Sequence, residues 1–549
     1  MAQALRRISR CHSTALARPL QRHAPASLAF LAPPGRLLSR ASADTSNPDE
    51  ALLTPGVTTS KSQVPKTLKK DLKAIEDRLA RFRMDAVLPG VAATKPLSEL
   101  QVPVTKMTTL ENGLRVATQE TYGALCTFGV VVDAGSRDEM PGEEDGVCHL
   151  FEAMAFKSTD GMSHQQVVSA LDDLGAIPTA NSSREQLLLS VDVLRNSLPE
   201  AFQIFADIAL HPKIDVDEVE ESKMILGLHL ESMAPELMVK EAIQEAAYSG
   251  QALGRPHFVT PETLPRLTAE KLRSFQARHF TARNMVLAAA GVEHESFVAL
   301  ARKHFGGLSS GGNHSKRSAA VYRGGEKRIE QPASVDPFTR VAVGFEVAGW
   351  HDKDLVAMCV MQILLGGGDS FSAGGPGKGM YSRLYRELLN RYYWVEGAEA
   401  FVNLHNETGV LGIAGACDAG RAGQLMHEFC AQICKLALTP VDPVELSRAR
   451  NMLKCNVLTQ LESRIILFED LGRQFVTYGH REAPEALCRK IDEVKAEDVM
   501  NIARRAISKP VSISAVGKDL KNVPNYDQVE EGVVVGERRL GASPRHPKY

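Results

Sequence analysis

The fold is decided by two stretches that repeat one pattern, TFGVVVDAG at Thr127–Gly135 and RVAVGFEVAG at Arg340–Gly349. Each is an apolar strand that closes on Ala-Gly and precedes acidic residues and an apolar helix. A second pair follows in the same order, FQARHFTARNMVLAAAG at Phe275–Gly291 and IARRAISKPVSISAVG at Ile502–Gly517. Each member combines a helix, a basic turn and a strand ending at Gly. Two echoes in one order indicate an internal duplication, and the irregular mixture of strands and helices predicts two related α+β domains.

The domain limits follow from composition. We expect the first domain over 99–305 and the second over 331–523, separated by a hinge at 306–330 that is rich in Gly, Ser and Lys. The Asn112-Gly113 pair predicts a hairpin at the start of the first domain. We expect a polar tail over 524–549.

The N-terminus has a different composition from the rest. Residues 1–43 carry no acid and are rich in Ser and Arg, with arginines at 6, 7, 10, 18, 22, 36 and 40. This composition is typical of an organelle transit peptide, and its arginine density favours the mitochondrion over the plastid. Residues 44–98 are expected to form a linker with one candidate helix, Lys66–Arg83.

The overall composition argues against several classes of protein. The chain has 549 residues, 44% hydrophobic content and a net charge of -2, so no global positive field points to nucleic acid. The nine cysteines are scattered and show no Cys-x-x-Cys spacing, which favours a reducing compartment. No apolar run approaches the roughly 18 residues of a membrane-spanning helix.

A glycine-rich stretch, GGGDSFSAGGPGKGMYSRLY, covers Gly366–Tyr385. It lacks the spacing of a phosphate-binding loop, because Ser372 replaces the first glycine and Gly379 replaces the Ser/Thr. It follows an apolar helical run, Leu355–Leu365, and precedes an apparent helix, Tyr381–Asn390, so it also fails as a dinucleotide fingerprint. The density of glycine predicts a mobile loop that carries function.

A degenerate zinc motif, HLFEA, begins at His149. In the His-x-x-Glu-His arrangement two imidazoles bind zinc and the glutamate activates water. Here Ala153 stands at the fifth position. His149 and Glu152 alone are too few ligands for a catalytic zinc site, so we expect no metal in this chain.

The glycine stretch and HLFEAMAFKST at His149–Thr159 resemble segments of non-catalytic subunits in the pitrilysin-like (inverzincin) metallopeptidase family. The resemblance covers about residues 100–520 and implies two similar α+β domains. It implies a third zinc ligand on a later helix, where Leu228 stands at the ligand position, Glu221 matches an earlier glutamate and Glu231 is the nearest later acid. His149 and Glu152 are then vestigial.

The resemblance also implies a function. In such heterodimers a zinc-bearing β subunit cleaves targeting peptides from imported precursors, and the non-catalytic subunit binds the precursor. Carried over, the substrate-binding residues are Gly366, Gly367, Gly368, Asp369, Ser370, Phe371, Ser372, Ala373, Gly374, Gly375, Pro376, Gly377, Lys378 and Gly379. Asp369 departs from the family pattern and adds a negative charge. Glycine backbone can pair with an extended peptide of any sequence.

Two alternatives stay open. The same family supplies core subunits of respiratory complex III, where the chain would act as a scaffold at the inner membrane facing the mitochondrial matrix. An independent zinc peptidase with unusual ligands is the other, and Ala153 and Leu228 argue against it.

Overall fold

The computed structural model describes residues 103–311, 317–331, 336–369 and 380–538. The predicted transit peptide (1–43), the linker (44–98) with its candidate helix Lys66–Arg83, and Ser370–Gly379 lie outside the described residues. Among the described residues, no helix is both long and apolar enough to cross a membrane.

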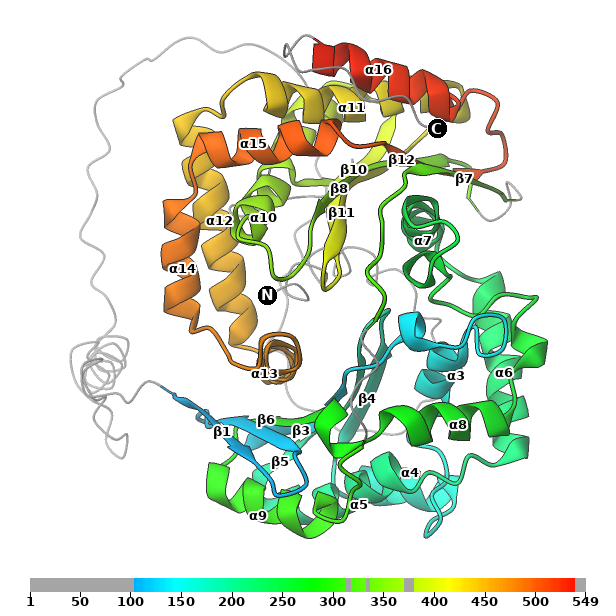
Figure 1. The fold of residues 1–549 in the computed structure, drawn as a ribbon, viewed down its shortest axis with the longest axis vertical. Coiled ribbons are helices and arrows are strands. Elements are labelled where there is room, and N and C mark those ends of the chain that lie inside the picture. The colour runs from blue at the N-terminus through cyan, green and yellow to red at the C-terminus, as the bar shows by residue number, and fades with distance from the viewer. Residues whose placement is uncertain (1–102, 312–316, 332–335, 370–379, 539–549) are drawn as a thin grey trace, which may run out of the picture. The chain divides into compact units, whose positions relative to one another are not determined.

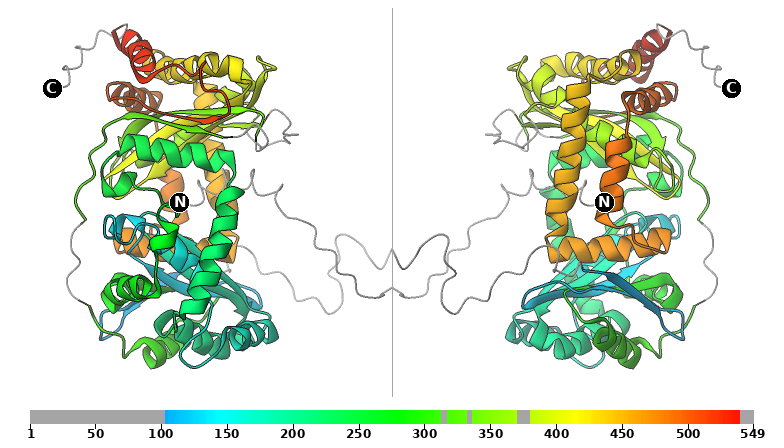
Figure 2. Two further views of the ribbon diagram at one scale, coloured as in Figure 1. Left: turned by 90° about the vertical axis from the view of Figure 1, so that its right-hand side faces the viewer. Right: turned by 90° about the vertical axis from the view of Figure 1, so that its left-hand side faces the viewer.

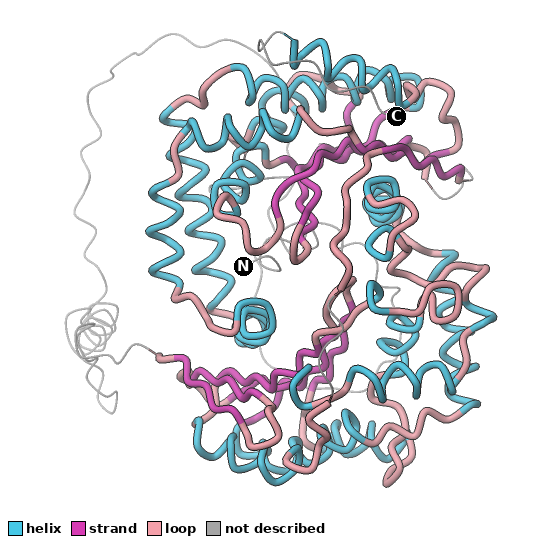
Figure 3. Tube along the Cα trace, viewed as in Figure 1, coloured by secondary structure: helices cyan, strands magenta, loops and turns pink. Residues whose placement is uncertain are grey.

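The described chain builds two six-stranded mixed sheets (Figures 1 and 3). The first sheet has the order β1-β2-β6-β3-β5-β4. Its strands are β1 (Thr105–Thr109), β2 (Arg115–Gln119), β3 (Leu125–Val132), β4 (Ile177–Ser182), β5 (Leu187–Leu194) and β6 (Met285–Ala290). The Asn112-Gly113 pair lies between β1 and β2, and Gly113 has a φ of 93°. The predicted hairpin is therefore confirmed.

The second sheet has the order β7-β12-β8-β11-β10-β9. Its strands are β7 (Gly325–Glu330), β8 (Thr339–Ala348), β9 (Gly367–Asp369), β10 (Val395–Leu404), β11 (Thr408–Cys417) and β12 (Ser512–Gly517). β7 lies inside the stretch predicted as a hinge, where its polar sequence GEKRIE suits an edge strand paired on one side with β12.

The two sheets repeat one topology. Five strands of each sheet correspond in order, β2-β6-β3-β5-β4 and β7-β12-β8-β11-β10, and in each series the first two strands pair in parallel, β2 with β6 and β7 with β12. β6 and β12, the last strands of their sheets along the chain, then pair antiparallel with β3 and β8. The two sequence echoes correspond to β3 and β8 and to the last helix-strand pair of each half. The predicted duplicated α+β fold is confirmed.

Helices cover these sheets. Those that precede β7 are α3 (Val147–Met154), α4 (His164–Asp173), α5 (Leu198–Leu210), α6 (Val216–Glu231), α7 (Pro235–Ala247), α8 (Ala269–His279) and α9 (His294–Phe305). Those that follow β8 are α10 (Leu355–Leu365), α11 (Ala422–Leu438), α12 (Pro443–Leu461), α13 (Arg464–Tyr478), α14 (Pro484–Glu493), α15 (Ala496–Ile507) and α16 (Tyr526–Arg538).

α16 corrects the predicted polar tail over 524–549. Its Val529 and Val533 are buried in the core of the second half. They are spaced four residues apart, so they share one helix face, but the many charged residues between and around them hid this face in the sequence.

One helix of each half packs against the sheet of the other half (Figure 2). α7 comes from the first half, yet its Val239 and Ile243 pack against Phe401 and other residues of the second sheet. α13 comes from the second half, and its Phe468 and Leu471 pack against the first sheet. Because each exchanged helix covers apolar surface of the other half, burial of this surface ties the two halves together.

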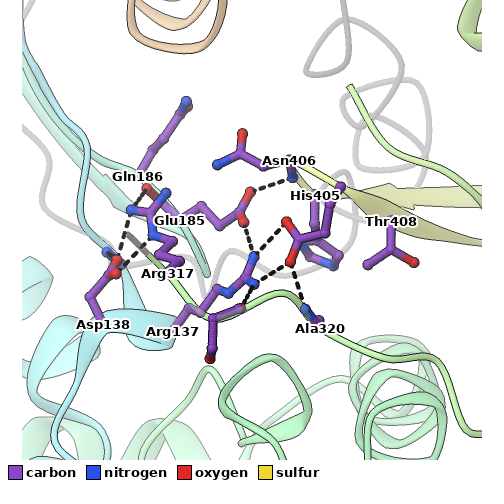
Figure 4. Close-up of polar contacts among 12 residues, drawn as sticks. Arg137, Asp138, Glu185, Gln186, Arg317, Ala320, His405, Asn406 and Thr408 are labelled. Carbon is purple, nitrogen blue, oxygen red and sulfur yellow. Dashed lines mark hydrogen bonds and ion pairs between the residues drawn. The ribbon is translucent and has the colours of Figure 1, made fainter. Parts of the chain in front are cut away.

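An ionic junction adds to this exchange (Figure 4). The buried guanidinium of Arg137 donates to Glu185 at 2.5 Å, to Glu407 in the β10–β11 turn, and to the Ser318 carbonyl at 2.6 Å. Arg317 pairs with Asp138 at 2.8 Å. The chain between the two halves is thereby held by side chains of the first half.

Candidate functional site

α3 carries the degenerate zinc motif. It starts after Gly146, whose φ of 93° is in the left-handed region and whose Cβ, if present, would lie 2.7 Å from Val259. The Glu139 carboxylate accepts the Gly146 and Cys148 N–H groups at 2.9 and 2.7 Å, which satisfies unpaired donors at the start of the helix. This end of α3 is therefore fixed by both backbone and side-chain contacts.

Glu152 is engaged in a structural contact. Its carboxylate accepts the Ser182 N–H at 2.7 Å and the Ser182 hydroxyl at 2.6 Å. Ser182 is the last residue of β4, so Glu152 holds the end of this edge strand. The Ser182 hydroxyl also lies 3.3 Å from His257 Nε2.

His149 offers no lone pair to a metal. Its Nδ1 accepts the Val259 N–H at 3.2 Å. Burial, with a smaller contribution from nearby His229, lowers the pKa of His149 to about 4, so the ring is neutral at pH 7. A neutral imidazole that accepts through Nδ1 carries its proton on Nε2. In this state neither ring nitrogen can bind zinc.

The residues at which the family resemblance implies a third ligand are no better placed to bind a metal. Leu228 is 62% exposed on α6, and Glu221 pairs with Lys157 at 3.1 Å. Within the described ranges, no group of three His, Cys, Asp or Glu residues could hold a metal ion. The residues present do not fit a catalytic zinc ion.

A polar cluster that the sequence did not reveal lies beside the motif. Arg184 donates to both carboxylate oxygens of Glu241, at 3.1 and 2.6 Å, and Glu241 accepts the His257 N–H at 3.4 Å. Burial acts to raise the pKa of Glu241, but Arg184 and His257 outweigh it and lower the pKa. These residues come from separate segments with no common spacing, so only the fold brings them together.

The glycine stretch begins as a strand. Gly367–Asp369 form β9, which pairs with β10 at the edge of the second sheet. Gly367 has a φ of 119°, and a Cβ on it would lie 2.0 Å from the Ala398 carbonyl oxygen. Gly366 also has a positive φ, 59°. The expected mobile loop is therefore wrong for these first residues, and backbone geometry requires glycine at Gly366 and Gly367. The other predicted binding residues, Ser370–Gly379, lie outside the described residues.

The chain after the glycines is anchored to α12. Arg383 forms a two-pronged ion pair with Glu445 at 2.8 and 2.9 Å, and the Arg448 guanidinium lies 5.4 Å from the Tyr381 ring centre. Tyr381 itself is 68% exposed. The predicted helix here is a short π-helical turn, Tyr385–Leu389, a feature that is frequent at functional sites.

Comparison with known proteins places the chain in a family. The family model "Insulinase (Peptidase family M16)" matches residues 115–261, and "Peptidase M16 inactive domain" matches 266–453. Mitochondrial-processing peptidase subunit alpha of Homo sapiens is 33% identical over 489 residues, covering 84% of this chain and 93% of that protein. Its counterpart in Solanum tuberosum is 37% identical over 452 residues, with 81% and 88% coverage.

A solved structure shows the same fold. A chain of "Complex III2 from Candida albicans, Inz-5 bound" superposes with a TM-score of 0.67 at 20% identity, covering 78% of this chain and 99% of that chain. At this identity the match establishes the fold alone. The sequence relatives go further, and the chain belongs to peptidase family M16 and, within it, to the family of mitochondrial-processing peptidase α subunits.

Proposed function

We propose that this chain is the non-catalytic, substrate-recognition subunit of a heterodimeric mitochondrial processing peptidase. A zinc-bearing β subunit is its partner and performs the cleavage. Precursors that carry N-terminal targeting peptides are the substrates. The relatives named above and the arginine-rich residues 1–43 support a mitochondrial location, and we place the heterodimer in the matrix.

The observation that carries this proposal is the state of the degenerate motif on α3. Ala153 replaces a ligand, His149 accepts a backbone N–H through Nδ1, and Glu152 is bound to the end of β4. A group that activates water must reach a metal-bound water. Here the same side chains stabilise the fold, so the chemistry is left to the partner.

Recognition is assigned to the segment from Gly366 to Gly379. Its start is fixed by the pairing of β9 with β10, and the residues that follow it are fixed by Arg383 and Glu445. A glycine backbone between two anchors can offer N–H and C=O groups to targeting peptides of varied sequence. Exposed Met380 and Tyr381 add apolar contacts beside it.

A reconstitution experiment tests the proposal. A precursor cleavage assay would compare this chain alone, the β subunit alone and the mixture, with bound zinc counted in each. We expect cleavage only in the mixture and no zinc in this chain. Zinc and cleavage from this chain alone would overturn the proposal.

Deleting Gly374–Gly379 tests the recognition segment. We expect weaker precursor binding by a heterodimer that still assembles, and unchanged affinity would remove the segment from the mechanism. If no mixture cleaves and the chain migrates with cytochromes on a native gel, the scaffold role in complex III becomes the better account.

A further inference from the structure

The outward face of α6 has an unusual pattern. Asp217, Glu221, Met224, Leu228 and Glu231 follow one another at alternating spacings of four and three residues, so they form one stripe along the helix. All five are exposed. Met224 and Leu228, in its middle, are 72% and 62% exposed. The buried residues of α6, such as Val219 and Leu226, lie on its other face.

The apolar centre of this stripe needs an explanation. The outward face of a surface helix is normally polar, because its inward face already supplies the apolar contacts. Adjacent exposed apolar side chains with a polar rim mark interaction sites. Ile225, 40% exposed, widens the patch. The patch thus has the composition of a docking surface.

Both ends of the stripe are acidic. Asp217 and Glu231 form no ion pair within the described part of the chain. Glu221 pairs with Lys157, but its side chain remains 60% exposed. A ligand with an apolar face and flanking positive charges would match this order of charge and apolar surface.

The stripe lies beside the degenerate zinc motif. Lys157, just after α3, reaches Glu221 on α6, and His229 is close enough to His149 to lower its pKa. The exposed face of α6 thus continues from the position that the family uses for its third zinc ligand. A peptide that binds near this motif would meet the stripe.

We infer that the α6 stripe binds the apolar face of a basic, amphipathic targeting peptide in helical form. This inference rests on the proposed function and adds a second contact surface to it. The stripe from Asp217 to Glu231 is about 21 Å long, the length of a helix of roughly 14 residues. Met224 and Leu228 contact the apolar face of the peptide, while the carboxylates attract its flanking cations. The segment from Gly366 to Gly379, by contrast, contacts the backbone of the peptide.

The test uses the assembled heterodimer and a fluorescent synthetic peptide that is basic and amphipathic. We expect the double variant Met224→Ser/Leu228→Ser to bind the peptide about tenfold more weakly, as expected for losing two apolar contacts. Asp217→Asn/Glu231→Gln should weaken binding a few-fold at low salt and have little effect at high salt, because exposed charges are screened. Leu458→Ser on α12, at a comparably exposed leucine, is the matched control.

The outcomes separate this inference from the proposed function. If the wild-type heterodimer binds and cleaves but the α6 variants bind equally well, the inference fails and the proposed function stands. If the wild-type heterodimer does not bind the peptide, both fail. If the variants no longer assemble with the β subunit, the stripe belongs to the subunit interface and the inference is overturned. Unchanged melting curves of the isolated variants would show that folding is intact.

Discussion

The two halves share five strands in one order but differ at the edges of their sheets, most informatively at the edge formed by β4 in the first sheet and by β9 in the second. β4 closes the first sheet, and its last residue is held by the side chain of Glu152. The equivalent strand of the second half, β10, is not an edge, because β9 pairs with it. One edge is fixed by a side chain from the degenerate zinc motif, and the other by glycine backbone. The duplication therefore preserved the sheets, while the features assigned to function differ between the edges.

The largest loss of stability is expected from substitutions in α7 and α13, the helices that pack on the sheet of the other half. Phe468 is fully buried, and it packs so closely on β3 that a Cβ on Gly129 would lie 2.9 Å from its ring. Phe468→Ala should lower the free energy of unfolding by about 3–5 kcal/mol through lost burial and a cavity. Urea titration of the purified chain would measure it.

The other exchanged helix, α7, gives a matching prediction for the second sheet. Ile243→Ala should lower the free energy of unfolding by about 2–5 kcal/mol, because Ile243 is fully buried against that sheet. If Phe468→Ala lowers the free energy of unfolding by less than about 1 kcal/mol, α13 does not stabilise the first sheet. The exchange of α7 and α13 would then not hold the two halves together.

The sequence predicted the strands and helices better than it predicted which of them pack against one another. The echoes at Thr127–Gly135 and Arg340–Gly349 revealed β3 and β8 because buried strands are apolar over their whole length. The exchange of α7 and α13 was not predictable, since an apolar helix face does not specify which sheet it covers. β7 was hidden by its polar edge sequence, and β9 by glycines that resemble a loop.

The candidate site shows the same limit. The motif spacing identified His149 and Glu152 and the missing ligand at Ala153. It could not show that Ser182 and Val259 occupy their hydrogen-bonding groups, because these contacts join residues far apart in the chain. The pairing of Arg184 with Glu241 has no sequence signal for the same reason.

The next largest loss of stability is expected at β9, the glycine strand at the edge of the second sheet. Gly367→Ala should destabilise the pairing of β9 with β10 by about 1–3 kcal/mol, since its φ of 119° strains any L side chain and its Cβ would clash with Ala398. Hydrogen exchange of the β10 amides would report this loss. Gly368→Ala is the matched control, because nothing lies within 4 Å of its Cβ position. Equal exchange in both variants would contradict a conformational requirement at Gly367.

The ionic junction gives a smaller and pH-dependent effect. Glu407→Gln should cost roughly 1–2 kcal/mol at neutral pH, because charge-assisted hydrogen bonds from Arg137 are lost. Burial acts to raise the pKa of Glu407, but hydrogen bonds from Arg137 and the Ala320 N–H outweigh it and hold the pKa below its usual 4.5.

The sign of the pH dependence follows from this lowered pKa. Ionised Glu407 contributes stability above the usual glutamate pKa of 4.5, and this stability is lost as the pH falls through the lowered pKa. The difference in stability between wild type and Glu407→Gln should therefore shrink below about pH 4.5. Glu185, whose pKa burial raises, is present in both proteins. A difference that grows on acidification would contradict the assignment.

The smallest effect is expected at the edge strand β4, which Glu152 of the degenerate zinc motif holds. Glu152→Gln keeps an oxygen that can accept from Ser182, so the free energy of unfolding should fall by about 1 kcal/mol or less. In the heterodimer, kcat for precursor cleavage should stay within about twofold of wild type, because Glu152 contacts no reacting atom in the proposed mechanism. A general base contributes about 100-fold or more to a rate. A loss of that size would return Glu152 to the chemistry and end the contrast between an edge held by a structural carboxylate and an edge held by glycine.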